Sequence, residues 1–195
     1  MRRLLPSLLA VLLALSCTPG AGGATASPGP STAPPPQQPA PSPQPVIAAP
    51  ATLILDGSQA GLAPSGGQDH LDLAEAASLE QNQPLALTRY RSWGWVDEAT
   101  RTWGGRSPSL DERLLLLTRA EGARQAFSDL AGQWLVPPMK RTSCPAALRL
   151  DDCAVGSSGS HAILVGRLGV YVVRFDADGV DVDTEAALQV EQLSA

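Results

Sequence analysis

The chain has 195 residues, with 14 lysines and arginines against 19 aspartates and glutamates, and a net charge of −5 when both histidines are neutral. This length fits one domain and excludes a multidomain enzyme. The acidic balance disfavours non-specific binding to nucleic acid, which is a polyanion, so nucleic acid is not an expected partner.

The first 17 residues have the layout of a secretory signal peptide. Arg2 and Arg3 form a positive head, residues 4–15 form an apolar segment, and a small residue precedes Cys17. The apolar segment has 12 residues, whereas a helix that crosses the bilayer needs about 20, so the segment is too short to remain as a span. We therefore predict that residues 1–16 direct export and are then removed.

The sequence Ala14, Leu15, Ser16, Cys17 resembles the lipobox of bacterial lipoproteins. The resemblance implies cleavage before Cys17 and attachment of lipid, including palmitate-like acyl chains, to its thiol. At about 0.8 kcal/mol per buried methylene, several chains hold a protein permanently on a membrane. The expected location is the cell membrane or the outer membrane, with the domain facing outside the cytoplasm. Thr18 stands where an aspartate would imply inner-membrane retention. The alternative is an ordinary signal peptide cut nearby.

Residues 17–50 are predicted to be the lipidated cysteine followed by a disordered tether. Residues 18–50 carry no charge and contain 11 of the 18 prolines in the chain. Proline fixes φ and removes an amide donor, so this composition favours a polyproline II-like chain over helix or sheet. At about 3.1 Å per residue, such a tether reaches on the order of 100 Å.

Residues 51–195 are predicted to form a single α+β domain. The sequence alternates between patterns typical of strands and of helices. In chain order, we expect an edge strand at 52–55, a short helix within 69–80 capped by Asp69, and strands within 90–103 and 112–118. A helix starting at a Thr118–Glu121 capping box, strands at 161–165 and 170–175, and a helix at 184–193 should follow. The repeated order ββα-ββα predicts an antiparallel sheet of about four strands with helices packed on one face.

The closing pattern GVYVVRF…DTEAALQVEQL, residues 169–175 and 183–193, resembles the end of small extracytoplasmic sensor-like or ligand-binding domains carried by bacterial envelope lipoproteins. The resemblance implies a binding role outside the cytoplasm. It transfers no site residues, because a hairpin followed by a helix is a common ending.

Two cysteines remain in the domain once Cys17 is assigned to lipid. Cys144 and Cys153 form an even pair in a chain with an export signal, which favours a disulfide. The alternatives are a redox pair, although the spacing is far from C-x-x-C, and a metal site with two thiolates and two missing ligands.

A group of aromatic and arginine side chains is the first candidate for ligand binding. Alternating tryptophans on one strand face could stack on a sugar ring or a peptide, with arginines beside them. The alternative is that the tryptophans fill the core, since the chain has only two Phe and two Tyr. The candidate residues are Tyr90, Trp93, Trp95, Arg101 and Trp103.

A run of five carboxylates in residues 176–185 is a candidate calcium site, because calcium prefers oxygen ligands at closely spaced positions. The spacing departs from an EF-hand loop, in which glycine is sixth and glutamate twelfth. The alternative is a turn at Asp178 and Gly179, followed by a helix capped by Asp183. The candidate ligands are Asp176, Asp178, Asp181, Asp183 and Glu185.

The serine-rich segment before His161 suggests a hydrolase with an activated serine, but adjacent residues such as Ser160 and His161 point to opposite faces of a strand. No sequence motif for a nucleophile elbow, a phosphate-binding loop or a four-ligand zinc site is present. We therefore expect a lipid-anchored, non-enzymatic envelope protein without a cofactor. Its tethered domain would bind an envelope protein, a glycan or a small ligand. The alternatives are an envelope hydrolase and a calcium-responsive module.

Overall fold

The protein is described here by a computed structural model, which covers residues 47–195. The predicted signal peptide, Cys17 and most of the predicted tether lie outside the described residues. We expected the domain to start at residue 51, but residues before it already contact the domain. The hydroxyl of Tyr171 donates a hydrogen bond of 2.8 Å to the carbonyl of Ala48.

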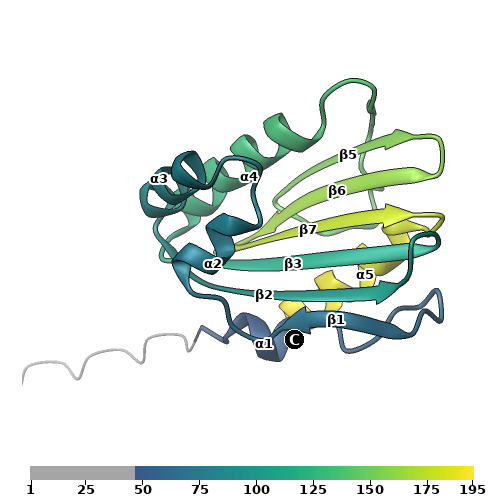
Figure 1. Cartoon of the computed structure of the whole chain (residues 1–195), viewed down its shortest axis with the longest axis horizontal. Coiled ribbons are helices and arrows are strands. Elements are labelled where there is room, and N and C mark those ends of the chain that lie inside the picture. The colour runs from purple at the N-terminus through teal and green to yellow at the C-terminus, as the bar shows by residue number, and fades with distance from the viewer. Residues whose placement is uncertain (1–46) are drawn as a thin grey trace, which may run out of the picture. The chain divides into compact units, whose positions relative to one another are not determined.

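Seven strands form one antiparallel sheet in the order β1-β2-β3-β7-β6-β5-β4 (Figure 1). The long hairpin β2–β3 and the hairpin β6–β7 meet at the centre, where β3 pairs with β7. The strands are β1 (Pro64–Gln68), β2 (Trp95–Gly104), β3 (Ser109–Leu117), β4 (Lys140–Thr142), β5 (Asp152–Ser158), β6 (His161–Leu168) and β7 (Tyr171–Asp178).

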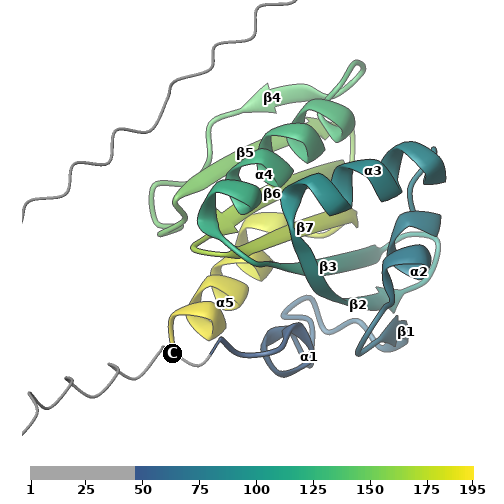
Figure 2. The same cartoon turned by 90° about the vertical axis from the view of Figure 1, so that its left-hand side faces the viewer.

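Helices cover both faces of the sheet (Figures 1 and 2). The expected sheet of about four strands with helices on one face was therefore wrong in strand number and in layering, although the general α+β class holds. One face carries α2 (Leu73–Ser78), α3 (Gln83–Trp93) and α4 (Ala120–Trp134), and the other carries α1 (Pro50–Leu53) and α5 (Val182–Ser194).

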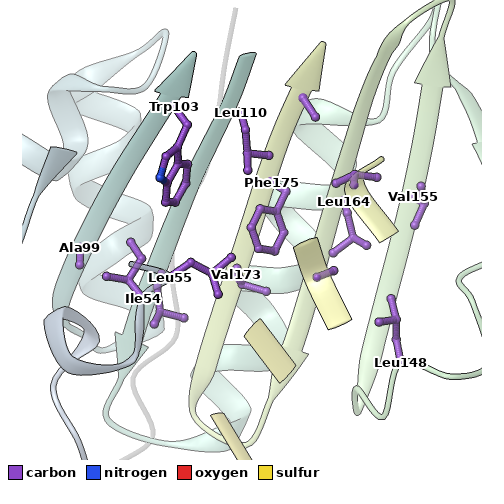
Figure 3. Close-up of a cluster of buried hydrophobic side chains, with 14 residues drawn as sticks. Ile54, Leu55, Ala99, Trp103, Leu110, Leu148, Val155, Leu164, Val173 and Phe175 are labelled. Atoms are coloured by element: carbon purple, nitrogen blue, oxygen red, sulfur yellow. The ribbon is translucent and has the colours of Figure 1, made fainter. Parts of the chain in front are cut away.

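The two-sided covering follows from the alternation of side chains along the central strands. On β3, Leu114 packs beneath α5 and Leu115 packs beneath α4, and both are almost fully buried. The cluster on the α5 face includes Trp103, Leu164 and Phe175 (Figure 3). Because the apolar run in β3 is buried on both faces, it requires a helical layer on each side.

Residues 90–93, which we expected to be extended, form the end of helix α3. Its first turn accommodates Pro84, because the amides of the first turn need no partner within the helix. Asn82 caps the start by accepting a hydrogen bond from the amide of Leu85, and Gly94 ends the helix with φ of 74°. The prediction of strand from residue 90 was therefore wrong, and β2 starts only at Trp95.

The helix predicted after β3 is present as α4, but its start differs from the expected capping box. Arg119 is the N-cap and makes no side-chain cap bond. The short helix within 69–80 is present as α2, and there Asp72, not Asp69, makes a capping box with Glu75.

Residues 50–60 lie across the α5 face and are held by buried polar side chains. The segment expected as an edge strand begins instead with α1. Glu112 accepts a hydrogen bond from the amide of Leu55 at 3.3 Å, and Gln189 donates one to the carbonyl of Leu53 at 2.9 Å. Glu185 accepts bonds from Ser58 Oγ and from the amides of Gln59 and Ala60.

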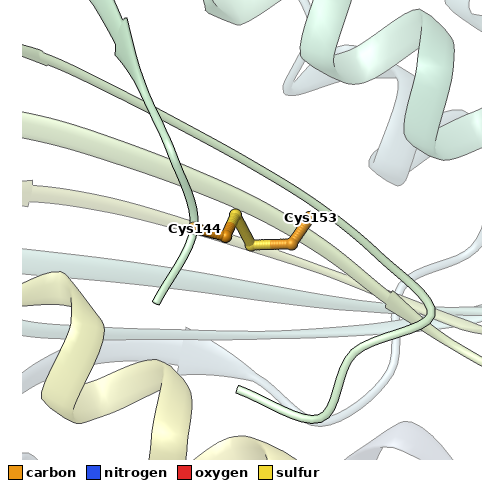
Figure 4. Close-up of a disulfide and its surroundings, with 2 residues drawn as sticks. All are labelled: Cys144 and Cys153. Atoms are coloured by element: carbon orange, nitrogen blue, oxygen red, sulfur yellow. A yellow bond between two sulfur atoms is a disulfide. The ribbon is translucent and has the colours of Figure 1, made fainter. Parts of the chain in front are cut away.

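The predicted disulfide between Cys144 and Cys153 is confirmed (Figure 4). It joins the segment after β4 to the second residue of β5. Both cysteines pack against the apolar cluster on the α5 face. The bond therefore fastens the edge of the sheet at β4, a strand of only three residues.

Candidate ligand-binding site

Half of one sheet face is left uncovered by helices. Helices α2, α3 and α4 lie over the left-hand half of the strands in Figure 1, and the right-hand half of that face is open. The side chains that point to this open area are polar, and strand register places them side by side. We call this area the polar half-face; it consists of Thr100, Thr102, Asp111, Arg113, His161, Arg174 and Asp176.

The polar half-face contains a pocket with a volume of about 250 Å³. Strands β2, β3 and β7 supply its charged groups, and Gln68 from β1 and Leu79 after α2 also line it. Carboxylates and guanidinium groups therefore converge on one small cavity.

Arg113 lies at the inner edge of the pocket, where the sheet passes beneath α2 and α3. Its Nε donates to Glu98 Oε1 at 2.5 Å and its Nη1 donates to Glu80 Oε1 at 2.6 Å. Its Nη2 donates to the hydroxyl of Tyr90 at 2.9 Å. Burial raises the pKa of the Glu98 carboxyl, and the Arg113 charge opposes that shift. Arg113 is therefore fully engaged by the protein.

Arg174 is the cross-strand neighbour of Arg113 and is much less satisfied. Its side chain is 10% exposed, and its guanidinium carbon lies 4.2 Å from the centre of the Trp134 ring. Its Nε and Nη1 atoms have no hydrogen-bond acceptor within residues 47–195. The carboxylate oxygen Oε1 of Glu80 lies 3.9 Å from its Nη1. Burial, followed by the charge of Arg113, lowers the pKa of Arg174. A buried guanidinium without close acceptors is energetically costly.

Two carboxylates face each other at the outer part of the pocket. Asp111 on β3 and Asp176 on β7 are register partners. Burial and then the charge of Asp176 raise the pKa of the Asp111 carboxyl, whereas a hydrogen bond from Thr102 acts in the opposite direction. This part of the pocket therefore attracts a proton or another cation.

His161 lies beside these carboxylates, at the start of β6. Its Nε2 is 2.7 Å from Asp176 Oδ1. Ser160 instead bonds to Asp178 Oδ1 at 2.5 Å, and that bond is the main cause of a lowered pKa at Asp178. Ser160 and His161 thus bind different carboxylates.

A larger cavity of about 430 Å³ lies between α3 and α4. Its polar groups are already bonded to one another: Arg89 Nη1 donates to Gln133 Oε1 and Gln133 Nε2 donates to Glu80 Oε2, each at 2.8 Å. The indole of Trp93 donates to Asp129 at 2.9 Å. A ligand there would have to compete with these internal bonds, so this larger cavity is the weaker candidate.

The five residues of the expected aromatic surface lie on both faces of the sheet. Tyr90 and Trp93 are buried side chains of α3, and the Trp95 ring is stacked 6.5 Å from that of Tyr90. Trp103 is buried on the opposite face. Arg101 is paired with Asp69 and lines the edge of the pocket in the polar half-face. The structure does not bring all five onto one exposed surface.

The five carboxylates expected to bind calcium are likewise distributed over separate contacts. Asp176 and Asp178 lie on β7, and Asp181 caps α5, a role we expected for Asp183. Glu185 is buried and holds residues 58–60. Residues 47–195 contain no group of three or more His, Cys, Asp or Glu side chains arranged to hold a metal ion.

Sequence reasoning missed Arg113 and Arg174 as site residues. A signal was present at Arg174, the only charged residue in the segment VYVVRF (170–175), whereas Arg113 directly follows Asp111 and Glu112. A lone arginine in such a run marks a buried charge that requires a partner. The partners Glu80 and Glu98 are distant in sequence, which concealed the network.

The chain was compared with protein-family models, curated proteins and solved structures, and none of them matches it. Within residues 47–195, every helix is too short or too polar to cross a membrane.

Proposed function

We propose that this chain is a lipid-anchored, non-enzymatic envelope protein that binds a small polar ligand in the polar half-face. The anchor and the export route rest on the resemblance of residues 14–17 to a lipobox. The observation that carries the binding role is Arg174, a buried guanidinium that lines a pocket and whose Nε and Nη1 atoms, both covered by the protein, have no hydrogen-bond acceptor among the described residues.

The position of Arg174 supports binding over a purely structural role. Buried arginines that serve stability alone are paired, as Arg167 on β6 is with Asp151 and Asp152. Arg174 has a comparable burial but only the ring of Trp134 and a carboxylate at 3.9 Å. A ligand that brings an acceptor would therefore recover hydrogen-bond energy that the protein alone does not obtain.

The experiment is a thermal-shift screen of the full-length protein against amino acids, short peptides, sugars and small anions. A compound that binds should raise the melting temperature by an amount that grows with the logarithm of its concentration above the dissociation constant. The rise should disappear in Arg174→Met and persist in Arg124→Met, which removes an exposed arginine on α4. The absence of any stabilising compound, or an equal rise in Arg174→Met, would contradict the proposed site.

The anchor has its own test. Wild-type protein made in bacteria supplied with labelled palmitate should incorporate the label, and Cys17→Ala should not, because that thiol carries the lipid. Equal labelling of the two proteins, or no label in either, would contradict the anchor without affecting the binding site.

An envelope hydrolase is a second candidate, because His161 and Asp176 form a 2.7 Å pair at the pocket. Such a pair can position a general base. It is the weaker proposal, since the hydroxyl of Ser160 binds Asp178 and not His161. If the protein hydrolyses esters, peptides or glycosides, His161→Ala should abolish the activity, and full activity in that variant would remove the candidate.

A further inference from the structure

We infer that the ligand of the polar half-face is a small zwitterion, an α-amino acid or a short peptide, with its carboxylate on Arg174 and its ammonium group on Asp111 and Asp176. The inference rests on the proposed binding function and names its ligand class. It follows from the charges that line the pocket and from the distance between them.

The carboxylate of the ligand is specified by Arg174. A guanidinium presents parallel N–H groups that match the two oxygens of a carboxylate, and such charge-assisted bonds are stronger than neutral ones. Arg113 cannot take this role, because its three nitrogens already donate to Glu98, Glu80 and Tyr90.

The ammonium group of the ligand is specified by the balance of charge. The pocket and its inner edge hold three guanidinium groups, on Arg101, Arg113 and Arg174, and five carboxyl groups, on Glu80, Glu98, Asp111, Glu112 and Asp176. Arg101 pairs with Asp69, and Glu112 accepts the bond from the Leu55 amide. Glu80 and Glu98 pair with Arg113, which leaves Asp111 and Asp176 opposite Arg174, with Asp176 also bonded to His161 Nε2 through one of its two oxygens. Like charges on register partners repel each other, and a cation placed between them relieves this repulsion.

The spacing of these groups suits a short molecule. Arg174 and Asp176 are two residues apart on one face of β7, which corresponds to about 7 Å along the strand. Asp111 is one strand away, at about 5 Å. An amino acid or dipeptide, which carries one charge at each end, can therefore reach both sets of groups within a cavity of about 250 Å³.

Other ligand classes fit less well. A simple anion would meet the two aspartates, and a simple cation would meet Arg174. A sugar ring is commonly held by stacking on an aromatic face, and no aromatic residue is among those that line this pocket of the described domain. Trp134 stacks on Arg174 itself and is not part of the lining.

The test is isothermal titration of the full-length protein with unmodified amino acids and dipeptides. For each compound that binds, the N-acetylated form and the C-terminal amide are titrated as well, since each lacks one charge. We expect both blocked forms to bind at least about tenfold more weakly, the loss typical of one charged hydrogen bond. N-acetylglucosamine and inorganic phosphate serve as the sugar and anion probes.

Two variants locate the binding. Asp176→Asn should weaken zwitterion binding about tenfold or more, and this partly exposed side chain can be replaced without disturbing the core. Asp178→Asn is the matched control, because Asp178 lies two residues further along β7 and does not line the pocket. Arg174→Met should abolish binding.

The outcomes separate the two proposals. Equal affinity for a blocked and an unblocked form, or unchanged binding in Asp176→Asn, overturns the zwitterion class. Binding of the sugar or phosphate alone, with loss in Arg174→Met, overturns the class and leaves the proposed binding site standing. If no probe in this panel binds, the zwitterion ligand class is overturned. If no compound of the wider thermal-shift screen binds either, the proposed binding site is overturned as well.

Discussion

Nη1 of Arg113 lies 2.6 Å from Oε1 of Glu80, and both side chains are almost fully buried between β3 and the segment that follows α2. Glu98, which is fully buried on β2, binds the same guanidinium. One arginine thus neutralises two carboxylates that come from different parts of the chain. Removing Arg113 would leave both carboxylates buried without a cation. This costs more free energy than replacing the whole buried network by apolar residues.

We therefore expect Arg113→Met to lower the free energy of unfolding by about 3–5 kcal/mol. The measurement is urea unfolding at neutral pH. Arg124→Met, which removes an exposed arginine on α4, should change stability by less than about 0.5 kcal/mol. A similar small effect in both variants would show that the network contributes little.

Two glycines of α4 should respond oppositely to alanine. A Cβ at Gly122 would lie 1.8 Å from the carbonyl oxygen of Trp93, whereas a Cβ at Gly132 would meet no atom within 4 Å. Gly122→Ala must push α4 away from the end of α3 and should cost about 2 kcal/mol or more. Gly132→Ala should stabilise the helix by up to about 1 kcal/mol. Thermal unfolding of both variants tests this contrast, and a neutral Gly122→Ala would disprove the close approach.

Glu112 should make stability depend on pH. Burial raises the pKa of its carboxyl from the ordinary 4.5 to about 8, while the bond from the Leu55 amide opposes the shift. The folded protein therefore holds a proton that the unfolded chain releases, so this contribution is complete below about pH 4.5 and is lost as the pH rises through about 8.

The corresponding variant is Glu112→Gln, which stays neutral and can still accept the amide bond. Between pH 5 and pH 8 it should remove a slope of up to about 1.4 kcal/mol per pH unit from the unfolding free energy. Glu191→Gln, at an exposed position on α5, should leave the slope unchanged. Identical slopes in wild type and Glu112→Gln would place the pKa of Glu112 near its ordinary value.

The disulfide should contribute to stability mainly through the unfolded chain. It closes a short loop, with a sequence separation of 9, for which loop entropy predicts about 2–3 kcal/mol. Guanidinium unfolding with and without a reductant should show this loss, and the double variant Cys144→Ser/Cys153→Ser should be insensitive to the reductant. If reduction leaves wild-type stability unchanged, β4 and its neighbours do not depend on the bond.

Regular apolar patterns made part of the fold predictable. The helix α4 and the hairpin β6–β7 were found because their side-chain periods are clear. Helix α3 was missed because a proline such as Pro84 usually breaks a helix, although proline is also compatible with the first turn. Strand β5 was missed because its sequence, DCAVGSS, has little apolar character, and it is held by pairing with β6.

The candidate site was less predictable than the fold, for a physical reason. A buried charge depends on partners that only the folded chain assembles, and Glu80 and Glu98 reach Arg113 across 33 and 15 residues. The aromatic residues misled us because they are both the best sugar-stacking groups and the best core fillers. His161 and Asp176, in contrast, were both singled out from the sequence, and the structure places them together.

The bond from Tyr171 to the carbonyl of Ala48 fixes where the amino-terminal chain enters the domain. Tyr171 begins β7, and Asp176 lies five residues later, about 17 Å along the same strand. The domain thus has one pole where the chain is attached and another pole where the pocket opens. If the chain is held at a surface, a force on that attachment acts at the Tyr171 end of the domain. The pocket at the other end remains open to molecules that arrive from solution.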